Sequence, residues 1–325
     1  MSVPAQSLHP VEKWYLEDVV AANNSDDAGG LPFSPRLKTL ATSLLRHNQE
    51  LLHRELEELT VYRENADRDT SVDNGNVKTK QVNNRIAVIQ NALSHTISNR
   101  FSGSHSSLEE VESSYDAKKF DFRSTITGLV SEVALHRCRV EIDSKRTGSI
   151  LCFLPGMDEI KQCIVEIEEH CPTPELRNKI TILPLHSSIP QDDQQRVFEP
   201  AGPGTVKLIL ATNIAESSVT IDDVLTVIDT GLVREMVFDA SSAMSTMKTN
   251  PTSKASATQR LGRAGRVAPG TCYRLYSKGD FEVMDDRPTP ELQRTALESV
   301  CLQTCSMMEH SSDFFRVQDF LARAM

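Results

Sequence analysis

Between residues 149 and 231, short continuous apolar runs alternate with segments of helical periodicity. The runs are SILCFLP (149–155), ITILPLH (180–186), VKLILATN (206–213) and VLTVIDTG (224–231). Runs of this kind are typical of strands buried on both faces of a sheet. Their alternation with helices predicts an α/β fold, in which helices flank a parallel sheet. In such sheets the functional groups lie at the carboxyl ends of the strands.

Two helices are predicted after the first two runs. The first carries apolar residues at helical spacing, and Asp158 is placed to cap it. Those apolar residues are Ile160, Ile164 and Ile167. Ser187, Ser188 and Pro190 then favour a helix start before QDDQQRVF.

Residues 21–114 have a different, polar character. Leucines at three- and four-residue spacing predict a helix over 36–63, and a shorter pattern predicts another over 86–93. The segment 65–81 between them is charged and poor in apolar residues, which predicts a disordered loop. We interpret residues 21–114 as an insertion that forms a helical hairpin or short coiled coil, and a role in binding a protein partner is one hypothesis for it.

Composition narrows the class of protein. The 325 residues are 39% hydrophobic and 25% charged, which suits a globular chain in water. No run approaches the roughly 20 apolar residues of a membrane helix, so no membrane partner is expected. The N-terminal residues do not resemble a secretory signal, and the seven cysteines lack metal-ligand spacing. A reducing compartment, cytoplasm or nucleus, is therefore expected.

The net charge of −10 argues at first against a nucleic-acid partner. The sign of the charge is segregated along the chain, however. The segment from Ser241 to Lys278 contains seven basic residues and no acidic one. A local basic surface on an acidic protein is therefore expected.

The segment with the clearest chemistry is QRLGRAGR (259–266). If it is helical, Gln259, Arg263 and Arg266 lie at positions i, i+4 and i+7 and share one face. Two guanidinium groups and an amide on one face suit a polyanion, because each guanidinium offers a rigid fork of donors to phosphate oxygens. Gly262 and Gly265 would each weaken such a helix by about 1 kcal/mol, which suggests that a ligand approaches it closely. The alternative is an exposed basic helix with incidental glycines.

The chain resembles superfamily 2 helicases of the DEAH/RHA group, in which QRLGRAGR is similar to motif VI. SILCFLPGMDEI resembles motif IV, and ATNIAESSVTIDDVLTVIDTG resembles motif V. The resemblance implies a RecA-like second lobe over 115–280. It also implies a linker strand from a first lobe at 1–20, the insertion at 21–114, and the beginning of a winged-helix domain at 281–325 with a short helical segment.

For the nucleotide, the resemblance implies ATP with Mg²⁺. Arg263 and Arg266 would be arginine fingers on the β- and γ-phosphates, with Gln259 near the γ-phosphate. Phe198 matches the aromatic residue that stacks on adenine, although a core position on an amphipathic helix is the alternative. Asp222 matches the acid that contacts the ribose or the other lobe.

For the second ligand, the resemblance implies single-stranded RNA held by its backbone. Thr212 and Asn213 match the pair that binds it, and a simple turn after a strand is their alternative. Ser187 lies at the end of another strand and is a further candidate. Lys254 could contact phosphates or be a solvated surface residue. The segment Val233 to Ser256 is similar to the β-hairpin that separates strands.

The sequence also departs from the family. Ser217 stands where the family has Thr, and the insertion at 21–114 is longer than the usual linker. The 325 residues contain no GxxxxGK[ST] P-loop and no DExH carboxylate pair for Mg²⁺. ATP with Mg²⁺ would therefore be shared with a first RecA-like lobe, and the chain alone is expected to be inactive. Two alternatives stay open: a non-catalytic adaptor or RNA-binding lobe, and a lobe that acts on DNA, since backbone-binding residues do not report the 2′-hydroxyl.

Overall fold

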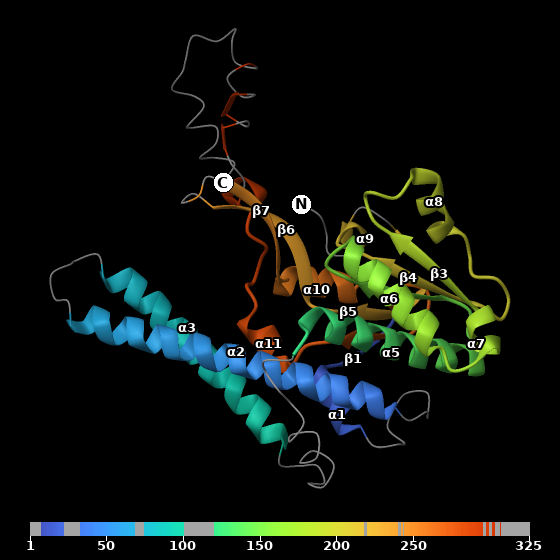
Figure 1. Cartoon of the computed structure of the whole chain (residues 1–325), viewed down its shortest axis with the longest axis horizontal. Coiled ribbons are helices and arrows are strands. Elements are labelled where there is room, and N and C mark those ends of the chain that lie inside the picture. The colour runs from blue at the N-terminus through green and yellow to red at the C-terminus, as the bar shows by residue number, and fades with distance from the viewer. Residues whose placement is uncertain are drawn as a thin grey trace.

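Six parallel strands form the central sheet of the computed structural model (Figure 1). The structure describes residues 8–22, 33–68, 75–100, 120–217, 220–239, 242, 244–294, 297, 298, 301, 302 and 306. The strands, in their order across the sheet, are β1 (Val11–Trp14), β8 (Gly270–Arg274), β5 (Val224–Asp229), β2 (Ser149–Phe153), β4 (Val206–Ala211) and β3 (Ile180–Leu185). The four apolar runs are β2, β3, β4 and β5, so the predicted α/β, RecA-like parallel sheet is confirmed.

The two faces of this sheet bury different sets of side chains. In β2, Ile150 and Cys152 pack against the first face, whereas Leu151 and Phe153 pack against the second. The first face is covered by α5 (Phe122–Asp143) and α6 (Met157–His170). The second is covered by the 3-10 helix η1 (Arg196–Phe198) and by the segment after α10 (Lys254–Leu261), through the buried side chains of Val197 and Ala264. Because both faces are covered, β2, β4 and β5 are buried at every position and consist mainly of apolar residues.

Helix α6 begins at Met157, two residues earlier than a cap at Asp158 would place it. Its N-cap is Gly156, which has no side chain to cap the helix, and Asp158 lies within the first turn. The prediction that Asp158 is the cap is therefore wrong. A carboxylate in the first turn is still stabilised there, because it faces the positive end of the helix dipole.

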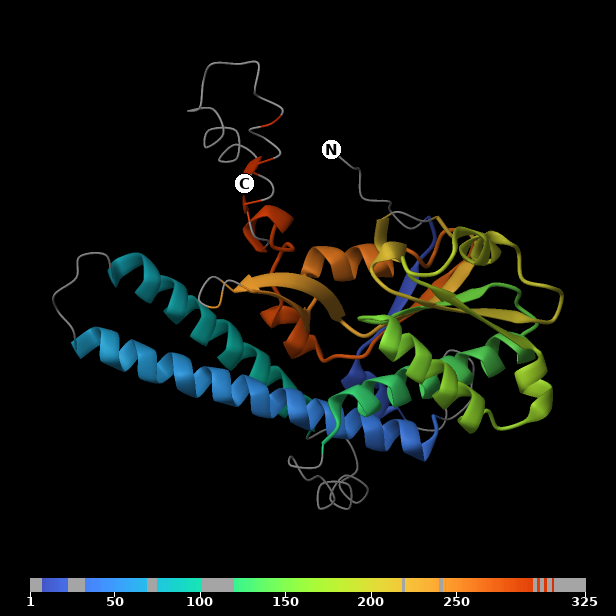
Figure 2. The same ribbon diagram turned by 45° about the horizontal axis from the view of Figure 1, so that its top comes forward.

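Two long helices form the insertion, α2 (Pro35–Arg68) and α3 (Gly75–Arg100). They pack against each other and extend away from the sheet as a hairpin (Figure 2). The helical hairpin was predicted, but the disordered loop over 65–81 was too long, since residues 65–68 and 75–81 are helical. A long exposed helix needs only one apolar stripe to pack against its neighbour, so most of its surface is polar. The polar residues at the ends of these two helices were therefore mistaken for a loop.

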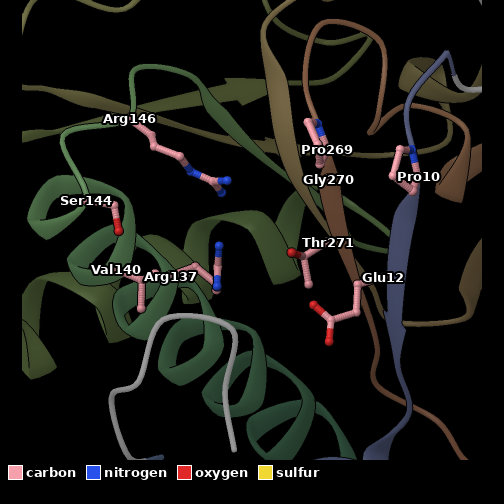
Figure 3. Close-up of a pocket in the computed structure, with 9 residues that line it drawn as sticks. All are labelled: Pro10, Glu12, Arg137, Val140, Ser144, Arg146, Pro269, Gly270 and Thr271. Atoms are coloured by element: carbon pink, nitrogen blue, oxygen red, sulfur yellow. The ribbon is translucent and has the colours of Figure 1, made fainter.

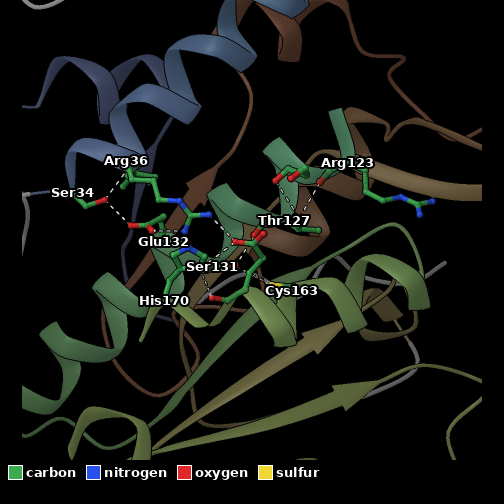
Figure 4. Close-up of polar contacts among 11 residues, drawn as sticks. Ser34, Arg36, Arg123, Thr127, Ser131, Glu132, Cys163 and His170 are labelled. Atoms are coloured by element: carbon green, nitrogen blue, oxygen red, sulfur yellow. Dashed lines mark hydrogen bonds and ion pairs between the residues drawn. The ribbon is translucent and has the colours of Figure 1, made fainter. Parts of the chain in front are cut away.

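Ion pairs fix the insertion to the first face of the sheet. Arg36, at the start of α2, donates to Glu132 of α5 at 2.9 Å and to Glu166 of α6 at 2.7 Å (Figure 4). Arg85 of α3 is paired with Glu55 of α2 at 2.8 Å and donates to the carbonyl of Val283 at 2.6 Å. The hairpin therefore bridges α5 and α6 to α11 (Lys278–Val283).

The remaining elements lie around the sheet. They are α1 (Leu16–Ala21), α7 (Pro174–Asn178), α8 (Gln191–Gln195), α9 (Ile214–Ser217), the antiparallel hairpin of β6 (Leu232–Asp239) and β7 (Met244–Pro251), and α12 (Glu291–Arg294). Of the helix predicted after Pro290, four residues form α12, and most of 295–325 lies outside the described residues. None of the helices described has the length and apolar character to cross a bilayer.

Candidate functional site

The QRLGRAGR segment is a helix only in its first half. Helix α10 ends at Leu261, Gly262 is its C-cap, and two i→i+3 hydrogen bonds tighten the chain over Arg263 and Ala264. Gly265 then has φ 73°, a conformation that favours glycine. A single helix over 259–266, the condition for one shared face, is therefore not present. The two glycines end the helix and turn the chain, so Gln259, Arg263 and Arg266 do not form one helix face.

Arg260 is the best-anchored side chain of the segment, and the sequence reasoning missed it. It is 1% exposed, and its guanidinium donates to Glu216 at 2.7 Å and to Asp229 at 2.8 Å. It also lies 5.0 Å from the centre of the Phe153 ring. Burial alone would lower the pKa of Arg260, but the two carboxylates raise it above its usual value. The buried group is thus a fixed cation.

Arg263 and Arg266 form a pair of like charges beside this anchor. Arg263 donates to the backbone carbonyl of Glu216, in α9. Burial lowers the pKa of Arg263, and the positive charge of Arg266 lowers it further. Since a multiply charged anion would relieve that repulsion, the pair is suited to adjacent phosphate groups. Gln259 is exposed at the end of α10.

Three of the predicted nucleotide residues lie toward the amino ends of the strands. The carbonyl of Gly265, next to Arg266, accepts a hydrogen bond of 2.9 Å from His9 N, just before β1. Asp222 is exposed immediately before β5. Lys207, near the start of β4, donates to the carbonyl of Val197 at 2.9 Å and so fixes the adjacent Phe198.

Phe198 is 51% exposed, so the alternative of a core position is wrong. The sequence placed functional groups at the carboxyl ends of the strands, and these three predicted residues do not lie there. Phe198 and Arg266 belong to η1 and to the segment after α10, which cover the second face of the sheet.

The predicted RNA residues lie at the opposite, carboxyl edge. Leu185 of β3 pairs with Ala211 of β4, so Ser187 and Asn213 each follow that pair by two residues on neighbouring strands. Both are exposed. Thr212 is 7% exposed, and its backbone N–H donates to the carbonyl of Leu185 at 3.3 Å. Ser187 and Asn213 therefore present short polar side chains side by side, while Thr212 is largely buried.

Four of the seven basic residues of the segment 241–278, where a local basic surface was expected, are paired with acids or buried. Acids from outside the segment pair with its cations: Lys254 with Asp286 at 3.0 Å, and Lys278 with Asp18 at 3.1 Å. Arg260 is buried between its two carboxylates, and Arg274 is 4% exposed. Lys254 is therefore tied to Asp286 rather than presented beside Asn213.

A comparison with known proteins adds to this geometry. Residues 133–268 match the family model described as the helicase conserved C-terminal domain. This region is a helicase C-terminal domain, and it is similar to the C-terminal lobe of DEAH-type helicases. The match contains α9, α10 and the three arginines described above, so the resemblance seen in the sequence is confirmed.

Curated relatives extend the match beyond the helicase lobe. The ATP-dependent DNA/RNA helicase DHX36 of Bos taurus is 41% identical over 197 residues, which are 61% of this chain and 18% of that protein. The putative ATP-dependent RNA helicase DHX57 of Homo sapiens is 32% identical over 310 residues, which are 93% of this chain and 21% of that protein. The chain thus spans about a fifth of the length of the curated relatives it matches.

A solved structure is also similar to this chain. The crystal structure of the Escherichia coli DEAH/RHA helicase HrpB matches with 29% identity and a TM-score of 0.49. It covers 58% of this chain and 22% of the HrpB chain. Within the described residues of the lobe, no three His, Cys, Asp or Glu side chains are grouped to hold a metal ion.

Proposed function

We propose that this lobe closes on a nucleoside triphosphate held by a first RecA-like lobe and couples its hydrolysis to movement along single-stranded RNA. The observation that carries the proposal is the Arg263–Arg266 pair, in which two guanidiniums repel each other beside a buried, fixed Arg260. Transfer of a phosphoryl group is catalysed mainly by positioning and by stabilisation of charge. A pair of cations beside a buried anchor would supply both.

In this proposal Arg263 and Arg266 contact the β- and γ-phosphates of ATP, with Gln259 near the γ-phosphate. Phe198 stacks on the adenine, and Asp222 contacts the ribose or the first lobe. The exposed ring of Phe198 and the exposed carboxylate of Asp222 both suit contact with a second body. Mg²⁺ would neutralise phosphate charge, and its ligands would come from the first lobe.

The RNA is proposed to lie at the carboxyl edge of the sheet. Asn213 and Ser187 bind its phosphates or sugars there with short side chains, next to Thr212. Contacts of this kind grip the backbone without reading sequence. The hairpin of β6 and β7 would separate strands. The proposed nucleotide residues and RNA residues lie at opposite edges of the sheet. The QRLGRAGR segment and α9, which contact each other, would connect the two sets.

The experiment is ATP hydrolysis by the native protein that contains these residues. We expect turnover that single-stranded RNA stimulates, and none by the 325-residue chain alone, because these residues contain no P-loop. A native protein that does not hydrolyse ATP with or without RNA would overturn the proposal. Hydrolysis by the isolated chain that is lost in Arg266→Ala would contradict the dependence on a first lobe.

Replacement of Phe198 tests the adenine contact. We expect Phe198→Ala to raise the KM for ATP of the native protein about tenfold, because stacking of a base on an aromatic ring contributes about 1–3 kcal/mol. Phe198→Tyr, which keeps the ring, should leave the KM near its original value.

The matched control for Phe198 is Val165→Ala. Val165 is 50% exposed, like Phe198, but it lies on α6 and on the other face of the sheet. An equal change of KM in the two alanine variants would show that Phe198 does not contact the nucleotide.

The insertion supports a second candidate, a partner-binding function. Leu51, Val61 and Tyr62 of α2 are 45%, 57% and 50% exposed, and they lie on the long hairpin. Such a function would coexist with the helicase lobe. Deletion of the hairpin beyond residue 50 would then abolish association with the partner.

A further inference from the structure

The two edges of the sheet differ in what lies beside the proposed ligand residues. At the amino edge, a cavity of about 320 Å³ opens between the end of α5 and the starts of β1 and β8 (Figure 3). Gly270 lines this cavity and also adjoins the arginine segment, since a Cβ atom on Gly270 would lie 2.9 Å from Gly265 N. The cavity therefore belongs to the nucleotide edge. At the carboxyl edge, by contrast, the β6–β7 hairpin joins α6 through side chains that belong to neither proposed ligand set.

The β6–β7 hairpin is a sheet of its own, separate from the six parallel strands. The chain enters it from the carboxyl end of β5 through Thr230 and Gly231, and Gly231 turns with φ 70°. In the outer half of the hairpin, Met244 and Met247 are 61% and 57% exposed. Because a sheet of only two strands is marginally stable by itself, side-chain contacts are needed to hold the hairpin in one direction relative to the lobe.

Arg234 supplies such a contact near the base of the hairpin. Its Nη2 atom donates to Glu159 Oε1 of α6 at 2.7 Å, and its Nε atom donates to Thr249 Oγ1 of β7 at 3.4 Å. One guanidinium on β6 thus joins both strands of the hairpin to α6, because its donors are held in a rigid fork. A Cβ atom on Gly156 would lie 2.6 Å from Arg234 Nη1, so the glycine before α6 leaves the space that the guanidinium occupies.

Glu159 lies between two arginines. Its side chain is 6% exposed, and its Oε1 atom is also 3.0 Å from Arg123 Nε, at the start of α5. Because Arg123 gives this carboxylate a counter-charge, the loss of Arg234 would not leave it uncompensated. The contact with Arg234 is therefore the part of the cluster that concerns the hairpin rather than the fold of the lobe.

The face of the hairpin that carries Arg234 also carries an exposed pair of methionines. Alternate residues of a strand share one face, so Arg234 and Met236 lie on the same side of β6. Met236 is paired across the hairpin with Met247, and the two side chains are 41% and 57% exposed. Methionine makes favourable contacts with aromatic rings, so this pair suits contact with an unstacked base.

We propose that the Arg234–Glu159 ion pair holds the hairpin at a fixed angle on α6, so that Met236 and Met247 meet the bases at the point of strand separation. The inference rests on the proposed function, because it assigns these residues a role in the separation of strands by the hairpin. Arg234 and Glu159 are positioning residues, which act through the hairpin and contact neither nucleotide nor RNA. Their loss uncouples strand separation from ATP hydrolysis, because the nucleotide and RNA residues stay in place.

The test compares duplex unwinding with ATP hydrolysis in the native protein that contains these residues. In Arg234→Gln, the amount of duplex unwound per ATP hydrolysed should fall about tenfold, the effect of losing one hydrogen bond to a charged group. The kcat for ATP with single-stranded RNA should stay at its parent value. Arg234→Lys keeps the charge and should restore part of the unwinding. Glu159→Gln should act like Arg234→Gln, and the double variant should be no worse than either single variant, because the effects of two partners in one contact do not add.

The matched control is Glu168→Gln. Glu168 also lies on α6 and is paired with an arginine, Arg177, at 2.6 Å, but it lies near the other end of the helix.

Hydrogen exchange of the 325-residue chain provides a second measurement, which does not need ATP. The amides of β6 and β7 should exchange about tenfold faster in Arg234→Gln and in Glu159→Gln than in the parent, because the hairpin opens locally more often. The amides of β2 and β4 should keep the parent rate, which also establishes that the lobe is folded.

Unwinding per ATP that both single variants leave at the parent value would overturn the inference, as would an equal fall in Glu168→Gln. A fall of the RNA-stimulated kcat in Arg234→Gln but not in Glu159→Gln would show that Arg234 contacts RNA, and would also overturn it. A native protein that hydrolyses ATP but separates no duplex would exclude the role in strand separation. If the native protein does not hydrolyse ATP, the proposed function fails. Faster exchange of β6 and β7 in the variants would then still support the ion pair as the contact that holds the hairpin, and unchanged exchange would exclude it.

Discussion

Replacement of Arg266 by alanine is expected to lower the ATP turnover of the native protein by about 10³- to 10⁵-fold, the range that an arginine finger supplies. Arg266 is half-buried beside Arg263, close enough to lower the pKa of its neighbour. In the proposed function, its charge would act on the phosphoryl group as negative charge develops during transfer. The measurement is the steady-state kcat for ATP with saturating single-stranded RNA.

The comparison of Arg266→Lys with Arg266→Ala separates two contributions to kcat: that of the positive charge and that of the planar, forked donors of the guanidinium group. Lysine is a point charge without planar donors, so it should restore only a small part of kcat. RNA affinity without nucleotide should not change, because Asn213 and Ser187 lie at the other edge of the sheet. Lys161→Ala, an exposed cation on α6, is the control. A kcat for Arg266→Ala within about tenfold of the parent would exclude a finger role.

Four strands of the sheet, β2 to β5, could be predicted from the sequence because they are apolar runs packed between the two covered faces. Burial of every position in β2, β4 and β5 makes the apolar run continuous, and that pattern is local. Local pattern also predicted helices within α2 and α3, but it assigned residues 65–68 and 75–81 to a loop although they are helical.

The candidate site could be predicted only as a set of residue types. The spacing of QRLGRAGR predicted that Gln259, Arg263 and Arg266 share one helix face. Gly265, at φ 73°, breaks that helix, so the spacing rule did not apply. Arg260 was missed because its partners Glu216 and Asp229 are 44 and 31 residues away in the sequence. A long-range ion pair leaves no local pattern.

The buried cluster around Arg260 holds the arginine segment in place. Asp229 is fully buried at the end of β5, and it accepts from Arg260 and, at 3.0 Å, from the hydroxyl of Tyr276. Burial raises the pKa of Tyr276 well above its usual value, and the carboxylate of Asp229 raises it further. Tyr276 therefore stays a neutral donor. Glu216 joins the cluster to Arg263, because its side chain binds Arg260 while its backbone carbonyl binds Arg263.

Removal of the Arg260 guanidinium is therefore expected to destabilise the whole lobe. In Arg260→Met, Asp229 and Glu216 lose their cation, and loss of one partner of a buried ion pair costs about 3–5 kcal/mol. The measurement is urea unfolding of the 325-residue chain, followed by circular dichroism. Arg263 should also lose its fixed position, so the kcat of the folded native variant should fall although Arg260 does not contact the nucleotide.

Arg287→Met provides the matched control, because Arg287 is exposed, and its free energy of unfolding should change by less than about 0.5 kcal/mol. Arg260→Met/Asp229→Asn should recover part of the lost stability, since the double variant no longer buries an uncompensated carboxylate. An Arg260→Met variant as stable as Arg287→Met would show that the cluster does not hold the lobe. A double variant less stable than Arg260→Met would show that Asp229 contributes through Tyr276 and the backbone of Gly231 rather than through Arg260.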